Sequence, residues 1–298
     1  MEGTYYLENF IKMIFGEVID ISKNLKNLLL MNVYEKTWGG TENPFYSFST
    51  GAGLTIKDML STIAITMCGV FFCIEFVKTL SKVEGTTYEM VLSVGLKFCL
   101  ARLAISLADS FVGALHVTSF SLILNASGAI ETMDGWSSPT QFMAAISSGT
   151  YDLGTTETFI HLGILLIPAV GVKLIFMVTQ ILAWGRLLEI IMLRTLMPIP
   201  VGCLFIDNGR ITKRYLASYF AVELQGLIML IALSFFRSFV ADDMKNIINT
   251  YGAHEGVTTP CPIVEVEKIA FKLLLGGIIM VIIMAKSGQW ASKVVGEG

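Results

Sequence analysis

Charged side chains interrupt the most apolar parts of this chain, and they are the residues with which it could do chemistry. They gather in two regions, 90–115 and 159–205, that are otherwise apolar enough for a membrane interior. An ionisable group at membrane depth is costly, and by default it indicates a functional or buried polar site. The candidate residues are Lys97, Arg102, Asp109, Arg186, Glu189 and Arg194.

The spacing of these charges predicts how they are arranged. Arg102 and Asp109 are seven residues apart, so they share one helix face. Arg186 and Glu189 are three apart and could pair along one helix. The alternative is structural: charges pair between helices, and those near span ends, such as Lys272, extend to the membrane surface.

A proline-containing segment follows the second charged region. The stretch reads LLEIIMLRTLMPIPVGCLF and includes Pro198, Pro200 and Gly202. An unbroken helix over 159–205 would be about 70 Å long, more than twice the ~30 Å hydrocarbon thickness. Because each proline removes an internal hydrogen bond, we expect a bent segment here. We expect it to face a neighbouring subunit or a water-filled passage.

The composition defines the elements that must position these residues. The chain of 298 residues is 54% hydrophobic and 15% charged, whereas soluble domains average about 25% charged residues. The apolar excess is spread along the chain, which predicts an all-α polytopic membrane protein. Runs of roughly 20 apolar residues are needed for each crossing. The expected transmembrane helices are about five: 59–78, 90–115, 159–182, 215–236 and 269–285.

The basic residues favour one orientation of these five spans, because Lys and Arg concentrate in short cytoplasmic loops. An outer N-terminus places seven basic residues inside: Lys78, Lys82, Arg210, Lys213, Arg214, Lys286 and Lys293. It leaves three in the outer loops: Arg237, Lys245 and Lys268. If the opening stretch of the chain also crossed, the protein would have six spans, with six basic residues inside and five outside. The distribution of basic residues would then favour neither orientation. We therefore expect an N-terminal region (1–58), a transmembrane domain (59–285) with outer loops at 125–158 and 237–268, and a cytoplasmic tail (286–298).

The N-terminal region is predicted to form an amphipathic helix. Apolar residues alternate at spacings of four and three, which is a heptad seam: Leu7, Ile11, Ile14, Val18, Ile21, Leu25 and Leu28. The segment is too charged to span. It either anchors at the membrane interface or packs between copies of the protein. The following stretch, WGGTENPFYSFSTGAG, is expected to be a loop.

The sequence lacks the common catalytic signatures. It contains no HExxH, GxSxG or Walker P-loop pattern, and its three histidines are far apart. The five cysteines form no CxxC pair, and we expect only Cys261 to be exposed. We therefore expect neither an enzyme nor a bound cofactor.

The segment 198–236 resembles a known family. It reads PIPVGCLFIDNGRITKRYLASYFAVELQGLIMLIALSFF, in which Pro198, Pro200 and Gly202 form a small-residue turn. A short basic segment and a long apolar helix follow. This pattern is similar to the TrbL-type polytopic inner-membrane component of type IV secretion and conjugation systems. The tail MAKSGQWASKVVG is similar to the tails of versions from Gram-positive conjugative elements.

The resemblance implies a function and partners. Such proteins form oligomers in the bacterial cytoplasmic membrane, work with other secretion-channel subunits and cytoplasmic ATPases, and contact translocating DNA, protein or pilin. The segment Asn125–Glu157, which has no Lys or Arg, would be the outer contact loop, and Trp136 is its candidate contact residue. Two alternatives remain open: a small-solute transporter that uses the intramembrane charges, and a structural membrane scaffold.

Overall fold

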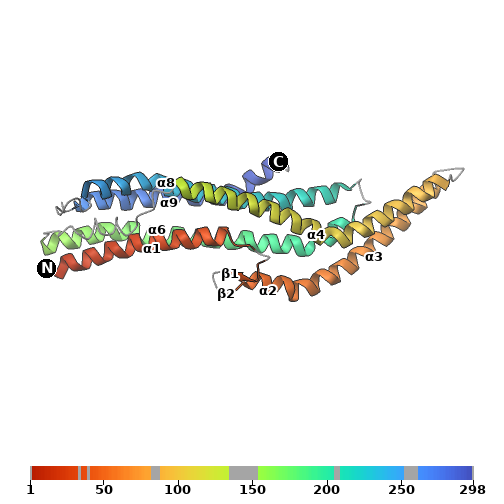
Figure 1. Ribbon diagram of the computed structural model, residues 1–298, viewed down its shortest axis with the longest axis horizontal. Helices are drawn as coiled ribbons and strands as arrows, with labels where there is room; N and C mark the ends of the chain where they lie inside the picture. Colours follow the sequence, from red (N-terminus) through yellow and green to blue (C-terminus); the bar gives the residue numbers. More distant parts are fainter. Residues whose placement is uncertain are drawn as a thin grey trace. The chain divides into compact units, whose positions relative to one another are not determined.

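The computed structural model describes residues 2–32, 35–38, 41–81, 88–133, 154–204, 209–251 and 261–296, and nearly all of them are helical (Figure 1). The elements in chain order are α1 (Glu2–Leu29), β1 (Thr37–Trp38), β2 (Thr41–Glu42), α2 (Pro44–Thr50), α3 (Ala52–Ser81), α4 (Tyr88–Met133), α6 (Thr155–Leu196), α7 (Pro198–Gly202), α8 (Arg210–Tyr251) and α9 (Ile263–Val295). The two short strands pair antiparallel, Thr37 with Glu42 and Trp38 with Thr41.

Five helical segments in the described residues are long and apolar enough to cross a membrane. They are Pro44–Ser81, Val91–Ser127, Thr156–Gly202, Arg210–Tyr251 and Ile263–Val295. α1 is not among them, as its charged residues predicted. The fold class is therefore confirmed as an all-α polytopic membrane protein with five such helices.

The chain forms two compact units. The first contains residues 1–30, 123–184 and 226–287, and the second contains 31–122, 185–225 and 288–298. Helices α4, α6, α8 and α9 each contribute residues to both units. The candidate charges Lys97, Arg102, Asp109, Arg186, Glu189 and Arg194 all belong to the second unit.

Helix α1 is amphipathic, as predicted, but its apolar seam is covered by the same chain. Six of the seven seam residues are buried, and Ile21 is half-buried. Within the first unit, Arg237 of α8 donates a hydrogen bond to Ser22 Oγ (3.0 Å), and Lys173 of α6 pairs with Glu17 (2.9 Å). Because the seam is buried by the chain itself and polar contacts link α1 to α6 and α8, α1 packs within the chain. The seam is therefore not available for the predicted contact between copies, and the interfacial position of α1 stays a prediction.

The helices also continue into segments that were predicted as loops. α8 extends through 237–251, α4 reaches Met133, and α9 covers most of the predicted tail up to Val295. The loops predicted at 125–158 and 237–268 are therefore shorter than expected. A hydropathy window detects only the apolar middle of a helix, whereas the backbone hydrogen bonds continue into its polar ends.

The stretch predicted as a loop before the first span is instead mostly helical. The Asn43 side chain accepts a hydrogen bond from the Phe45 N–H (3.0 Å) and thereby caps α2, whose first residue is Pro44. The Asn43 amide also donates to the backbone oxygens of Asn32 and Glu35 (3.0 and 2.9 Å). Asn at the N-cap and Pro at the first helical position are both strong start signals, so the sequence contains a local reason for this helix.

The helix is interrupted between α6 and α7, at the predicted prolines, and backbone oxygens beside the interruption have side-chain partners. Pro198 starts the one-turn helix α7 after α6 ends at Leu196. The Thr212 hydroxyl donates to Pro200 O, and the Tyr215 hydroxyl donates to Leu193 O, each at 2.6 Å. Two side chains of α8 thus donate to backbone oxygens on either side of the break, and Pro200 O also accepts a hydrogen bond from the Cys203 N–H (3.2 Å).

Small residues bring the helices of the second unit close together around this bend. Its buried core consists of Ala64, Cys68, Ala101, Ile105, Ala108, Val112, Ile190, Met197, Val201, Tyr219 and Val222. A Cβ atom added to Gly202 would lie 2.8 Å from Ala64 O, so α7 approaches the α3 backbone as closely as only glycine permits. Through these contacts the core fixes α3, α4, α6 and α8 in the register that brings their charges together.

Candidate functional site

A buried ionic cluster joins three helices of the second unit. His116 of α4 forms a hydrogen bond from Nδ1 to Glu223 Oε1 of α8 (2.6 Å), and Arg186 of α6 lies 3.8 Å from Glu223 Oε2. The three side chains are nearly inaccessible, with 2% of His116, 4% of Arg186 and 1% of Glu223 exposed. The arginine and the glutamate carry opposite charges, so each offsets the charge of the other in this buried position.

Arg186 is held by the α8 backbone as well as by the carboxylate. Its Nε donates to Val222 O (3.3 Å), and one terminal nitrogen donates to Glu223 O (3.4 Å). The predicted pairing of Arg186 with Glu189 along α6 is therefore wrong, because Arg186 points across to α8. A guanidinium has five donors in a fixed plane, and this arrangement uses several of them to link α6 to α8.

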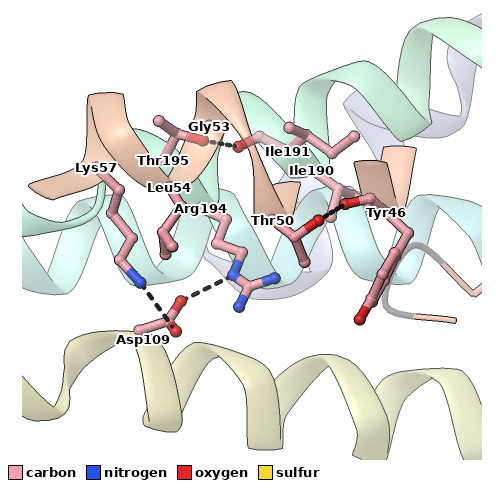
Figure 2. Close-up of a pocket in the computed structure, with 10 residues that line it drawn as sticks. All are labelled: Tyr46, Thr50, Gly53, Leu54, Lys57, Asp109, Ile190, Ile191, Arg194 and Thr195. Carbon is pink, nitrogen blue, oxygen red and sulfur yellow. Dashed lines mark hydrogen bonds and ion pairs between the residues drawn. The ribbon is translucent and has the colours of Figure 1, made fainter. Parts of the chain in front are cut away.

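A second cluster surrounds Asp109 of α4. Arg194 of α6 donates from Nε to Asp109 Oδ1 (2.9 Å), and Lys57 of α3 lies 3.1 Å from Asp109 Oδ2. Figure 2 shows both cations directed at this single carboxylate. Asp109 thus links three helices. Its partners are residues of α3 and α6, and Arg102, which shares its helix face, is not one of them.

The Asp109 cluster lines a cavity of about 280 Å³. Its walls come from α2, α3, α4 and α6, and all of its lining residues belong to the second unit. Besides the three charged groups, the cavity is bordered by Tyr46, Thr50, Gly53, Leu54, Ile190, Ile191 and Thr195. The predicted site residues Asp109 and Arg194 are thereby brought together at an accessible, partly apolar cavity.

The remaining candidate charges do not join these clusters. Lys97, Arg102 and Glu189 are exposed, and in the described part of the chain they form no ion pair or hydrogen bond. Exposed leucines lie beside them on the same helices, including Leu96, Leu103 and Leu188. These three charges therefore lie on the apolar outer surface of the second unit.

The first unit has its own interhelical ion pairs. His161 of α6 bonds from Nδ1 to Glu267 Oε1 of α9 (2.7 Å). Lys272 of α9 pairs with Asp243 of α8 and lies 5.4 Å from the Phe239 ring centroid. Lys272 therefore has a carboxylate partner on the neighbouring helix, and its extension to the membrane surface stays a prediction.

Cys261 also differs from its prediction. Its side chain is fully buried, whereas Cys73 and Cys99 are exposed. Burial, with a smaller contribution from the charge of Glu265, raises the pKa of the Cys261 thiol to about 11. The thiol is therefore protonated and poorly nucleophilic at neutral pH.

Two further sequence predictions can be placed. Pro198, Pro200 and Gly202 are buried in α7, next to the α3 backbone and the start of α8. Trp136 and most of its predicted contact loop lie outside the described residues. No group of three or more His, Cys, Asp or Glu residues within the described segments is arranged to hold a metal ion.

The candidate residues from the sequence include one of the three residues of the buried cluster, Arg186, and two of the three around Asp109. His116, Glu223 and Lys57 are not among the candidate residues taken from the sequence. The available signal was that a histidine and a glutamate in separate apolar spans each need a polar partner. Their separation of 107 residues, however, gives no direct indication that they meet.

Comparisons with known proteins add no identification, since no protein-family model, no curated protein and no solved structure matches the chain. The fold and the interhelical ion pairs define the class, a multi-pass helical membrane protein.

Proposed function

We propose that this protein is a channel or assembly-platform subunit of a conjugative type IV secretion system in the bacterial cytoplasmic membrane. In this role it forms a homo-oligomer and contacts other channel subunits, cytoplasmic ATPases and the translocating DNA, protein or pilin. The resemblance of residues 198–236 to the TrbL-type family indicates the system. The N-terminus is outside and the C-terminus is cytoplasmic.

The observation that carries this proposal is the outward position of Lys97, Arg102 and Glu189. A charged side chain at the centre of a bilayer costs about 2.5–3.5 kcal/mol even on insertion scales. The charges in the two clusters of the second unit have ion-pair partners within the chain. Lys97, Arg102 and Glu189 have no such partner among the described residues. The cost is avoided if these residues face another protein subunit or a water-filled passage, as in a membrane assembly.

The internal pairs support the same reading. A permease that binds a solute through midplane charges needs some of those charges free to meet the solute. In the buried cluster, Arg186 and His116 instead engage Glu223 and the α8 backbone. This arrangement suits a rigid helical platform that positions outward-facing charges toward neighbours.

The experiment is to measure the mass of the detergent-solubilised protein by light scattering, before and after removal of an outward charge. We expect a particle of several copies, and we expect Arg102→Gln or Glu189→Gln to shift it toward the single chain. Glu89→Gln is the matched control, because Glu89 is exposed in the first turn of α4. A single-chain particle that no variant changes would contradict the proposal.

The second candidate is a small-solute transporter, which the Asp109 cavity favours. This cavity presents both signs of charge to a space large enough for a small solute. Solute uptake that requires Asp109, in cells where DNA transfer is unaffected by loss of the gene, would favour it. If replacing every intramembrane charge left function intact, a structural scaffold would be the better description.

A further inference from the structure

The cavity at Asp109 carries more positive than negative charge. Lys57 and Arg194 line it together with Asp109, which is the single acid among its lining residues in the described part of the chain. Both cations share this one carboxylate, at 3.1 and 2.9 Å. With two positive charges and one negative charge, the cavity favours a ligand that carries a negative charge.

The cavity also has an apolar side that opens outward. Leu54 lines it and is 44% exposed, so this wall continues onto the apolar outer surface of α3. Ile190 also lines the cavity and is buried. The Tyr46 side chain points in the same direction as those of Lys57 and Arg194, toward α4 (Figure 2). A ligand that fits this surface combines an anionic group with an apolar part that remains outside.

The size of the cavity limits which part of such a ligand enters. At about 280 Å³ it lies near the lower end of the ~300–1,000 Å³ of small-molecule sites. A lipid headgroup fits this space, whereas a whole lipid does not. Basic pockets between transmembrane helices are known to hold anionic headgroups.

We propose that this cavity binds the phosphate headgroup of an anionic membrane lipid, with the acyl chains along the exposed surface that begins at Leu54. The phosphate oxygens accept hydrogen bonds from the Lys57 ammonium and the Arg194 guanidinium. Asp109 orients both cations when the site is empty and limits the affinity when it is filled. This site goes beyond the proposed secretion function and does not rest on it.

The test is the thermal unfolding of the full chain in an uncharged detergent with added lipid. A ligand that binds only the native state raises the melting temperature with concentration. We expect phosphatidylglycerol to raise it and phosphatidylcholine to leave it unchanged. Glycerol 3-phosphate, which lacks acyl chains, should bind at least tenfold more weakly. An equal effect of glycerol 3-phosphate would overturn the lipid assignment, and an equal effect of phosphatidylcholine would overturn the anion site.

Two variants with opposite expected effects separate binding from mere stability. Lys57→Gln removes one charge-assisted hydrogen bond and should weaken phosphatidylglycerol binding about tenfold. Asp109→Asn removes the repelling carboxylate and should strengthen binding, even though the lipid-free protein becomes less stable. Lys78→Gln, at an exposed lysine in the last turn of α3, is the matched control and should bind like the native protein.

The proposal fails if Lys57→Gln and Lys78→Gln bind phosphatidylglycerol equally, or if Asp109→Asn weakens binding. A measurement on the native protein keeps the test decisive if a variant does not fold. Because salt screens a partly exposed ion pair, the phosphatidylglycerol effect should decline as the salt concentration rises. A salt-independent effect would contradict binding through these charges.

Discussion

Removing the buried charges of Arg186 and Glu223, singly and together, gives the sharpest stability prediction. The two groups lie 3.8 Å apart and are almost fully buried. At an effective dielectric constant of about 20, opposite charges at this distance attract by about 4 kcal/mol. Breaking a buried pair by removing one partner typically costs about 3–5 kcal/mol, because the other charge stays buried and uncompensated.

We therefore expect Arg186→Met and Glu223→Gln each to lower the free energy of unfolding by about 3–5 kcal/mol. The double variant buries no unpaired charge, so its loss should be smaller than the sum of the single losses by about 2–3 kcal/mol. His116 remains available to the group at position 223 in either variant.

The assay is unfolding by titration of a denaturing detergent, followed by helical circular dichroism. The control is Glu89→Gln, which removes an exposed acid from the first turn of α4 and should cost less than about 1 kcal/mol. Losses that add to within about 0.5 kcal/mol would refute the reasoning, because independent sites behave in that way.

Three further predictions concern the bend and the buried thiol. Gly202→Ala should lower the free energy of unfolding by about 1–3 kcal/mol, because the added Cβ would lie 2.8 Å from Ala64 O. Thermal unfolding measures this loss, and an unchanged melting temperature would contradict the close approach of α7 to α3. Thr212→Val removes one of two donors to Pro200 O and should cost about 0.5–1.5 kcal/mol in the same assay, because the Cys203 N–H still donates to this oxygen. An unchanged melting temperature would show that the hydroxyl does not stabilise this part of the chain. Cys261, with a pKa of about 11, should stay a protonated thiol at pH 8 and react with maleimide far more slowly than the exposed Cys73 in the solubilised protein. Equal labelling rates would show that Cys261 is accessible.

Hydropathy predicted the spanning helices because each crossing needs a long apolar run, and this requirement is local in sequence. The heptad spacing predicted the buried seam of α1 for a similar reason, since the spacing determines which face is apolar. What covers the seam was not predictable in this way. The contact between Ser22 and Arg237 depends on how α1 is placed against α8, and no local pattern fixes that placement.

The candidate site was predicted only in part, for the same physical reason. Sequence spacing suggested that Arg186 pairs with Glu189 on one helix, but Glu223 on α8 is the actual partner. Pairing between helices depends on the register in which the helices pack. Small residues such as Ala64 and Gly202 determine this register here. The bend was predictable because proline acts locally, whereas its stabilisation by Thr212 was not.

The most direct measurement of the central claim is DNA transfer from a donor cell that carries the native element. The gene for this chain is deleted and then restored, either in native form or with Arg102→Gln or Glu189→Gln. The account predicts that transfer is lost while growth is normal, that the native gene restores it, and that the two variants restore it poorly although they reach the membrane. Unchanged transfer after deletion would contradict a role in the secretion channel.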